Sequence, residues 1–252
     1  MLFGHDVNSR NFSFLTQISN FRELYTCTLE EISDRFALVS FIHSLEHFSV
    51  PKNALFATHS LLSAESHLFV EVPNAAVNPF DLLVVDHRMH FTRQTLETLS
   101  SLAGFRTVCL VDDLISKELT LIGRRAKRRY STFAHAEHVW QLMLAHISWL
   151  QGIVSDAARI ADSSRSFGLF GSSVSAIWLK GVLRDRVQFF VDEDPARIGR
   201  KILGCPIYAA RDVPPRSDVF VPLVPAISAE VVRRIQHLPM VLHTPAPLER
   251  GM

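Results

Sequence analysis

The sequence predicts an α/β protein, because short apolar strands alternate with amphipathic helices along most of the chain. Residues 36–42 are almost all apolar and β-branched or aromatic, which is typical of a parallel strand buried on both faces. A helix that begins at Pro51 follows, and residues 67–72 form the next strand. Strand, helix and strand in this order predict a right-handed parallel crossover.

The chain then changes from a crossover unit to a hairpin. A second helix can begin at Thr92 and end at Gly104. Residues 106–111 and 118–123 are two short strands, and the space between them is too short for a crossover helix. We therefore expect them to pair in antiparallel orientation.

A long helix separates this region from a second α/β pattern. Residues 131–161 carry apolar positions three or four apart, which predicts one amphipathic helix. Strands are expected at residues 166–170, 187–191 and 219–224, with one helix between the first two strands and another at residues 228–235. The predicted domains are an incomplete sheet domain at 1–126, a connecting helix at 127–162 and a small Rossmann-like domain at 163–252.

The composition excludes several classes of protein. Of the 252 residues, 48% are hydrophobic and 20% charged, which predicts packed cores. The net charge of +1 gives no overall field that would recruit nucleic acid or a membrane, and the basic run at residues 124–130 is more typical of a solvated face. The longest apolar region, residues 139–154, is interrupted by polar residues. Cys27, Cys109 and Cys205 are far apart, which favours reduced thiols in a cytoplasmic protein.

A histidine-rich loop follows the first strand. His43, Glu46 and His47 fit the pattern H-x-x-E-H, in which two histidines on one helix bind zinc. Here the motif follows an apolar strand and ends before Pro51, so the two imidazoles would not share one helical face. We therefore expect no metal site. The carboxyl ends of parallel strands are where open α/β sheets bind ligands, which favours a role in lining a site. The alternative is that Glu46 caps backbone amides.

Asp86, His87 and His90 form a second candidate cluster. Proton transfer to or from a substrate requires a group poised near neutral pH, and an imidazole held by a carboxylate meets that requirement. The alternative is structural: Asp86 caps a helix and both histidines are ordinary surface residues.

The order of these segments resembles a known family. Residues 37–48, the helix at Pro51 and residues 68–74 resemble the fourth and fifth strands of class I S-adenosylmethionine (SAM) dependent methyltransferases. Residues 86–92 are similar to the E-H-x-x-Y-F-S segment of sugar C-methyltransferases. The resemblance implies catalytic roles for Asp86, His87 and His90, with His87 as the general base and Asp86 as the carboxylate that orients it. It places His43, Glu46 and His47 beside SAM and Pro73 and Asn74 beside the substrate.

The second α/β region resembles the carboxyl-terminal domain of the same sugar C-methyltransferases, through residues 167–176, 189–195 and 199–207. Gly168 and Gly171 permit a tight turn whose free amides, including that of Ser172, could meet a phosphate. Asp192 follows Gly171 by 21 residues, where a ribose-binding acid is often found. These four residues are predicted to bind a sugar nucleotide. The alternative is that they only turn and cap the chain.

Residues 2–7 resemble the second strand of the methyltransferase sheet, which implies that Asp6 meets the ribose of SAM. The glycine-rich loop of the family would precede this strand. We therefore expect a chain shortened at its amino-terminal end that binds SAM weakly or not at all.

Two functions remain open. The first is a SAM-dependent methyltransferase-like protein acting on a sugar or nucleotide-linked small molecule, without membrane or nucleic-acid partners. The second is a non-catalytic module that binds a nucleotide or sugar nucleotide. Hydride transfer is disfavoured, because the glycine fingerprint is incomplete.

Overall fold

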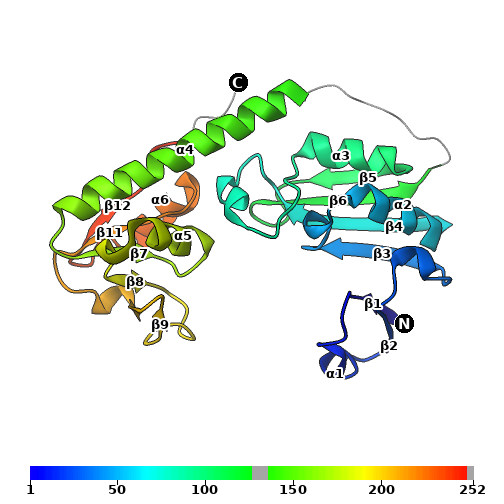
Figure 1. Ribbon diagram of the computed structural model, residues 1–252, viewed down its shortest axis with the longest axis horizontal. Coiled ribbons are helices and arrows are strands. Elements are labelled where there is room, and N and C mark those ends of the chain that lie inside the picture. The colour runs from blue at the N-terminus through cyan, green and yellow to red at the C-terminus, as the bar shows by residue number, and fades with distance from the viewer. Residues whose placement is uncertain (127–135, 249–252) are drawn as a thin grey trace. The chain divides into compact units, whose positions relative to one another are not determined.

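The computed structural model describes residues 1–126 and 136–248 (Figure 1). The α/β class predicted from the sequence is confirmed. No helix in these two ranges is both long and apolar enough to cross a bilayer. Part of the basic run, residues 127–130, lies outside the described residues, as does the start of the predicted connecting helix.

The chain forms two compact units. Unit 1 comprises Met1–Pro73 and Arg93–Phe133, and unit 2 comprises Asn74–Thr92 and Ala134–Met252. The segment Asn74–Thr92 therefore leaves unit 1 at the end of one strand and belongs to unit 2. The domain boundaries expected from the sequence remain predictions.

Unit 1 contains a four-stranded sheet with the order β3-β4-β6-β5. Strands β3 (Phe36–Ile42) and β4 (Leu62–Pro73) are parallel and are joined by helix α2 (Pro51–Leu61). Strands β6 (Glu118–Arg125) and β5 (Phe105–Val111) continue the sheet in antiparallel orientation. The predicted parallel crossover and the predicted hairpin are both confirmed.

The position of β3 differs from the sequence prediction. This strand lies at the edge of the four-stranded sheet, and of its seven residues only Phe41 is buried. Leu38 and Ile42 are each more than half exposed. The prediction that both faces of this strand are buried is therefore wrong. Burying both faces of a strand requires helices packed on both sides of the sheet, and an apolar sequence does not specify those helices.

The core of unit 1 lies between the sheet and its helices. Leu55 of α2, Leu68 and Val70 of β4 and Leu121 of β6 have no exposed surface. Helix α3 (Arg93–Leu102) packs on β5, and the predicted stop at Gly104 is confirmed, since this residue has φ +90.

A separate two-stranded parallel sheet begins the chain. It pairs β1 (Leu2–His5) with β2 (Phe21–Tyr25). A strand therefore lies where the sequence predicted one, but it is not part of the four-stranded sheet, so its predicted place in that sheet is wrong. Phe3 packs edge to face on Phe36, with ring centroids 5.4 Å apart, and so connects β1 to the start of β3. The short helices of unit 1 are α1 (Phe12–Leu15), η1 (Leu29–Glu31) and η2 (Leu45–His47).

Unit 2 contains a six-stranded sheet with the order β12-β11-β7-β8-β10-β9. All pairs are parallel except the one with β9. From β7 the chain moves outward through β8 and β10, and it then returns to the other side of β7 for β11 and β12. This is the strand order of a doubly wound Rossmann domain, with its switch point between β7 and β11. The predicted Rossmann-like domain is confirmed. The strands are β7 (Phe167–Phe170), β8 (Phe189–Val191), β9 (Lys201–Ile202), β10 (Cys205–Tyr208), β11 (Asp218–Phe220) and β12 (Val241–His243).

Helices complete unit 2 (Figure 1). Helix α4, which was predicted as a connector, packs against α5 and β11. One apolar cluster gathers residues of α4, α5 and β7, and a second gathers residues of β8, β11 and α6. The helices are α4 (Ala136–Ser163), α5 (Val174–Leu183) and α6 (Pro225–Ile235), with the short turns η3 (Pro79–Leu83), η4 (Arg184–Arg186) and η5 (Ala210–Asp212).

The core of unit 2 explains why the segment Asn74–Thr92 belongs to it. Phe80, in η3, is 8% exposed within the apolar cluster of α4 and α5, and its ring packs on Trp149 at 5.4 Å between centroids. The Ala75 amide donates to the Phe91 carbonyl at 2.8 Å. The segment is thus a loop that is closed at its base and anchored by an aromatic side chain.

A substitution at Gly168 tests the packing of unit 2. A Cβ at this position would overlap the ring of Phe189, which is buried. We expect Gly168→Ala to lower the free energy of unfolding by about 1–3 kcal/mol, the usual cost of overpacking. Gly152→Ala, in α4 and with no atom near the added methyl group, should instead stabilise by about 0.5–1 kcal/mol. Urea unfolding of both variants measures the difference, and equal effects would contradict the account.

Candidate active site

A buried carboxylate organises the segment Asn74–Thr92. Asp81, in η3, has a side chain that is 2% exposed. His87 Nδ1 lies 2.7 Å from Asp81 Oδ1, and His90 Nδ1 lies 2.5 Å from Asp81 Oδ2. One carboxylate therefore holds two imidazole rings, one on each oxygen.

This arrangement fixes the state of both rings. An ionised carboxylate can only accept hydrogen bonds, so each ring donates its Nδ1–H to Asp81. In the neutral imidazole the other nitrogen, Nε2, then carries the lone pair. His87 and His90 are both only partly buried, so a neutral ring held in this way can accept a proton at Nε2.

The structure brings together two of the three catalytic residues predicted from the sequence. His87 and His90 meet at Asp81, whereas Asp86 is exposed. The carboxylate that holds His87 Nδ1 is thus Asp81, which the sequence reasoning missed. Asp81 lies six residues before His87 and nine before His90, a spacing that no helical or strand period singles out. The catalytic roles of Asp86, His87 and His90 remain predictions.

A second cluster of ionisable side chains lies in unit 1. We call it the glutamate cluster: Glu46, Glu71 and Glu118 around His43. His43 directly follows β3, Glu46 lies in η2, Glu71 near the end of β4, and Glu118 begins β6. His43 Nδ1 is 3.7 Å from Glu46 Oε1 and 3.9 Å from Glu118 Oε2, and its Nε2 is 3.7 Å from Glu71 Oε1.

Burial shapes the electrostatics of this cluster. The side chains of Glu46, Glu71 and Glu118 are 2%, 10% and 15% exposed. Burial raises the pKa of Glu118 above its ordinary value; the imidazole of His43 opposes this, and the charges of Glu46 and Glu71 add to it. Three acidic groups thus share a site with a low capacity to stabilise charge.

The residues expected beside the cofactor are distributed over unit 1. His43 and Glu46 are in the glutamate cluster and His47 follows in η2, a three-residue turn rather than an α-helix. His43 itself lies outside that turn, with φ 46. Asp6 follows β1, and its Oδ1 accepts a hydrogen bond from the Asn8 amide at 3.1 Å. Their roles toward a cofactor stay predictions.

The residues expected beside the substrate fall into two groups. Pro73 ends β4, and Asn74 begins the loop of unit 2, where its Oδ1 accepts a hydrogen bond from the Ala76 amide. In unit 2, Gly168 packs against the Phe189 ring, and Gly171 turns the chain after β7 with φ +81. Gly168 therefore has a packing reason to be glycine.

Ser172 and Asp192 bind each other in unit 2. The Ser172 amide donates to Asp192 Oδ2 at 3.0 Å and its hydroxyl at 2.5 Å, while Arg197 Nη1 donates to the Ser172 hydroxyl at 3.0 Å. Burial alone would raise the pKa of Asp192, but hydrogen bonds from Ser172 and from the Asp194 and Glu193 amides hold that pKa below its ordinary value. Asp192 thus closes the turn after β7, and its predicted contact with a ribose is a separate, untested role.

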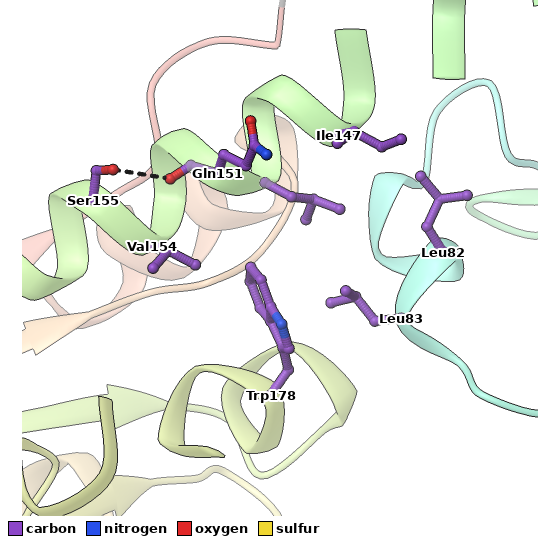
Figure 2. A pocket seen from close by; sticks show the side chains of 8 residues that line it. Leu82, Leu83, Ile147, Gln151, Val154, Ser155 and Trp178 are labelled. Atoms are coloured by element: carbon purple, nitrogen blue, oxygen red, sulfur yellow. Dashed lines mark hydrogen bonds between the residues drawn. The ribbon is translucent and has the colours of Figure 1, made fainter. Parts of the chain in front are cut away.

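An apolar pocket in unit 2 was not expected from the sequence. Its volume is about 490 Å³. Figure 2 shows Trp178 of α5 pointing toward Val154 of α4 on one side of it, with Leu82 and Leu83 on the side of η3. Both leucines directly follow Asp81 in the chain. The wall of this pocket is therefore built partly by the turn that positions His87 and His90.

No protein-family model matches the sequence, and no curated protein matches it. Among solved structures, it resembles a complex of the Haloferax volcanii Trm112 methyltransferase activator and a methyltransferase, with 10% identity, a TM-score of 0.42, and 51% of this chain and 72% of that chain covered. A Burkholderia thailandensis 1,6-didemethyltoxoflavin-N1-methyltransferase has 18% identity, a TM-score of 0.40, and coverages of 50% and 61%.

A SAM-dependent methyltransferase from Clostridium acetobutylicum has 10% identity, a TM-score of 0.40, and coverages of 49% of this chain and 74% of that chain. Each of these three solved structures contains a methyltransferase.

The pH dependence of stability tests the glutamate cluster. Because burial raises the pKa of Glu118, the folded chain binds this proton more tightly than the unfolded chain. The stability that this tighter proton binding contributes is fully present below the ordinary pKa of 4.5. It is lost as the pH rises through the pKa that Glu118 has in the folded chain. We expect Glu118→Gln to be more stable than the wild type at pH 8 and the advantage to disappear near pH 4.

Urea unfolding at both pH values measures this effect. Glu97→Gln, at an exposed position of α3, is the matched control and should change stability little at either pH. A Glu118→Gln variant less stable than the wild type at pH 8 would show that the carboxylate is a structural hydrogen-bonding group.

Proposed function

We propose that this chain is a SAM-dependent methyltransferase-like protein that acts on a sugar or nucleotide-linked small molecule. The observation that carries the proposal is the sheet of unit 1, in which parallel β3 and β4 are followed by antiparallel β6 and β5. This is the far edge of the sheet that the resemblance to class I methyltransferases implies. His43, at the end of β3, and Pro73, at the end of β4, lie at the carboxyl ends of the parallel strands, where α/β sheets bind ligands.

The side chains expected to hold SAM suit its chemistry. Glu46 Oε2 is buried and has no hydrogen-bond partner within the described residues. SAM carries an ammonium group and ribose hydroxyls, which are donors that such an oxygen lacks. In this proposal Asp6, His43, Glu46 and His47 hold the cofactor, which when bound supplies an electrophilic methyl group.

His87 is the proposed general base. Its Nε2 accepts the proton that leaves the carbon or hydroxyl of the acceptor as the new bond to the methyl group forms. Asp81 keeps the Nδ1–H in place before the transfer and stabilises the imidazolium after it. His90, held on the other oxygen of Asp81, is positioned to act in the same way. Asp86 is a secondary candidate for this proton relay.

Unit 2 supports a nucleotide-linked acceptor in this proposal. The crevice of a doubly wound sheet lies at its switch point, here at the carboxyl ends of β7 and β11. Gly171 and Ser172 follow β7 at this point, and Arg197 lies beside them. A basic side chain at this turn suits the phosphate of a sugar nucleotide.

A non-catalytic module is the second candidate. This candidate is favoured by unit 2, which has the full strand order of a doubly wound domain. Such a domain can bind a nucleotide without any contribution from unit 1. Thermal-shift measurements separate the two functions. Stabilisation by sugar nucleotides, but never by SAM or its demethylated product, would favour the module.

Methyl transfer from labelled SAM tests the catalytic proposal. With a panel of sugars and sugar nucleotides at millimolar SAM, we expect His87→Ala to lower the turnover number by about 10²–10⁴, the usual contribution of general acid–base catalysis. Asp81→Asn should lower turnover as well, because an amide at this position can hold a ring in the wrong tautomer.

His237→Ala, at an exposed position of unit 2, is the matched control and should retain activity. Melting temperatures of all three variants separate a loss of fold from a loss of chemistry. Full activity in His87→Ala would remove the assigned role.

A further inference from the structure

The glutamate cluster has an excess of negative charge in a buried place. Three carboxylates converge from η2, β4 and β6, and His43 is the basic residue that all three share. Lys117 is also near enough to lower the pKa of Glu118. Burying several like charges costs free energy unless a cation or hydrogen-bond donors offset it.

Two carboxylate oxygens of the cluster lack a donor. Glu46 Oε2 and Glu118 Oε2 are buried and have no hydrogen-bond partner in the part of the chain that the structure describes. The Glu46 side chain is almost fully buried, so it does not turn outward to water. Buried polar atoms are nearly always paired, and an unpaired acceptor points to a donor-bearing ligand.

His43 balances the charge without satisfying these oxygens. Its ring nitrogens lie 3.7 to 3.9 Å from the carboxylates, which is beyond hydrogen-bond distance. Its side chain is 48% exposed, and its backbone is in the left-handed region at φ 46. His43 is therefore at the mouth of the cluster, where it can move aside for another cation.

The spread of the carboxylates distinguishes between kinds of cation. Glu46 and Glu118 face one nitrogen of the His43 ring, whereas Glu71 faces the other. The three carboxylates are thus separated by the width of the His43 imidazole ring. A metal ion, by contrast, requires all its ligand atoms within about 2.0–2.6 Å of one point. An ammonium group on a carbon skeleton presents three donors and fits a wider site.

We propose that the glutamate cluster binds the ammonium group of a small molecule. The proposal rests on the proposed function for the source of that group, which is either an amino-substituted methyl acceptor such as an amino sugar or the amino acid end of the cofactor. Binding of a cation also explains why the chain retains three buried carboxylates at the carboxyl edge of its parallel strands.

The test is direct binding to the whole chain, measured by titration calorimetry and by the NMR signals of the His43 ring. The probes are glucosamine, with N-acetylglucosamine as its neutral counterpart, and S-adenosylhomocysteine. We expect one of the two ammonium probes to bind and to shift the His43 signals, with affinity at least tenfold weaker in Glu46→Gln and unchanged in Glu97→Gln. Glu71→Gln gives a second reading if Glu46→Gln does not fold.

Binding of glucosamine through the cluster identifies an amino-bearing acceptor, and binding of S-adenosylhomocysteine identifies the cofactor. The proposal is overturned if neither probe binds, if N-acetylglucosamine binds as well as glucosamine, or if both glutamine variants bind like the wild type. Displacement of the probe by equimolar Mn²⁺ would also overturn it in favour of a metal site. Methyl transfer, measured separately, distinguishes the two failures. Transfer that persists in both Glu46→Gln and Glu71→Gln overturns this proposal alone, whereas absence of transfer in the wild type overturns the proposed function.

Discussion

The candidate active site depends on the buried carboxylate of Asp81. A hydrogen bond to a charged group contributes about 1.5–3 kcal/mol, and Asp81 makes two such bonds to imidazole rings. These bonds offset the cost of burying the charge and fix His87 and His90 in one orientation. Phe80, the preceding residue, packs in the apolar cluster of α4 and α5 and holds the turn in place. One turn of η3 thus joins the core of unit 2 to both candidate bases.

The Asp81 cluster and the glutamate cluster differ in how their buried carboxylates are satisfied. In the Asp81 cluster each carboxylate oxygen has a donor within 2.7 Å, so the site is organised by the chain alone. In the glutamate cluster, Glu46 Oε2 and Glu118 Oε2 have no donor within the described residues, and the His43 ring nitrogens lie 3.7 to 3.9 Å from the three carboxylates. A satisfied carboxylate suits the orientation of a catalytic base. An unsatisfied one suits the recognition of a ligand, at a cost in stability that many functional sites carry.

The sequence predicted more of the fold than of the site. Apolar runs and glycine positions were enough to predict the β3–β4 crossover, the β5–β6 hairpin and the Rossmann-like class of unit 2, but not its strand order. They could not predict that β3 is an exposed edge strand, because apolar side chains such as Leu38 and Ile42 do not specify the neighbouring strand or the helices that would cover them. Asp81 was missed because its contacts with His87 and His90 depend on an irregular turn, which has no regular residue spacing to reveal them in the sequence. Glu118 was missed because it reaches Glu71 only through the antiparallel register of β4 and β6, which pairs it with Pro73.

The central claim is that Asp81 holds His87 with its proton on Nδ1 and its lone pair on Nε2. Long-range proton–nitrogen NMR spectra of the ¹⁵N-labelled histidine rings measure this tautomer directly. The account predicts that, at a pH where the ring is neutral, His87 is the Nδ1–H tautomer in the wild type and loses this preference in Asp81→Ala. An Nε2–H tautomer in the wild type, or the same tautomer in both proteins, would contradict it.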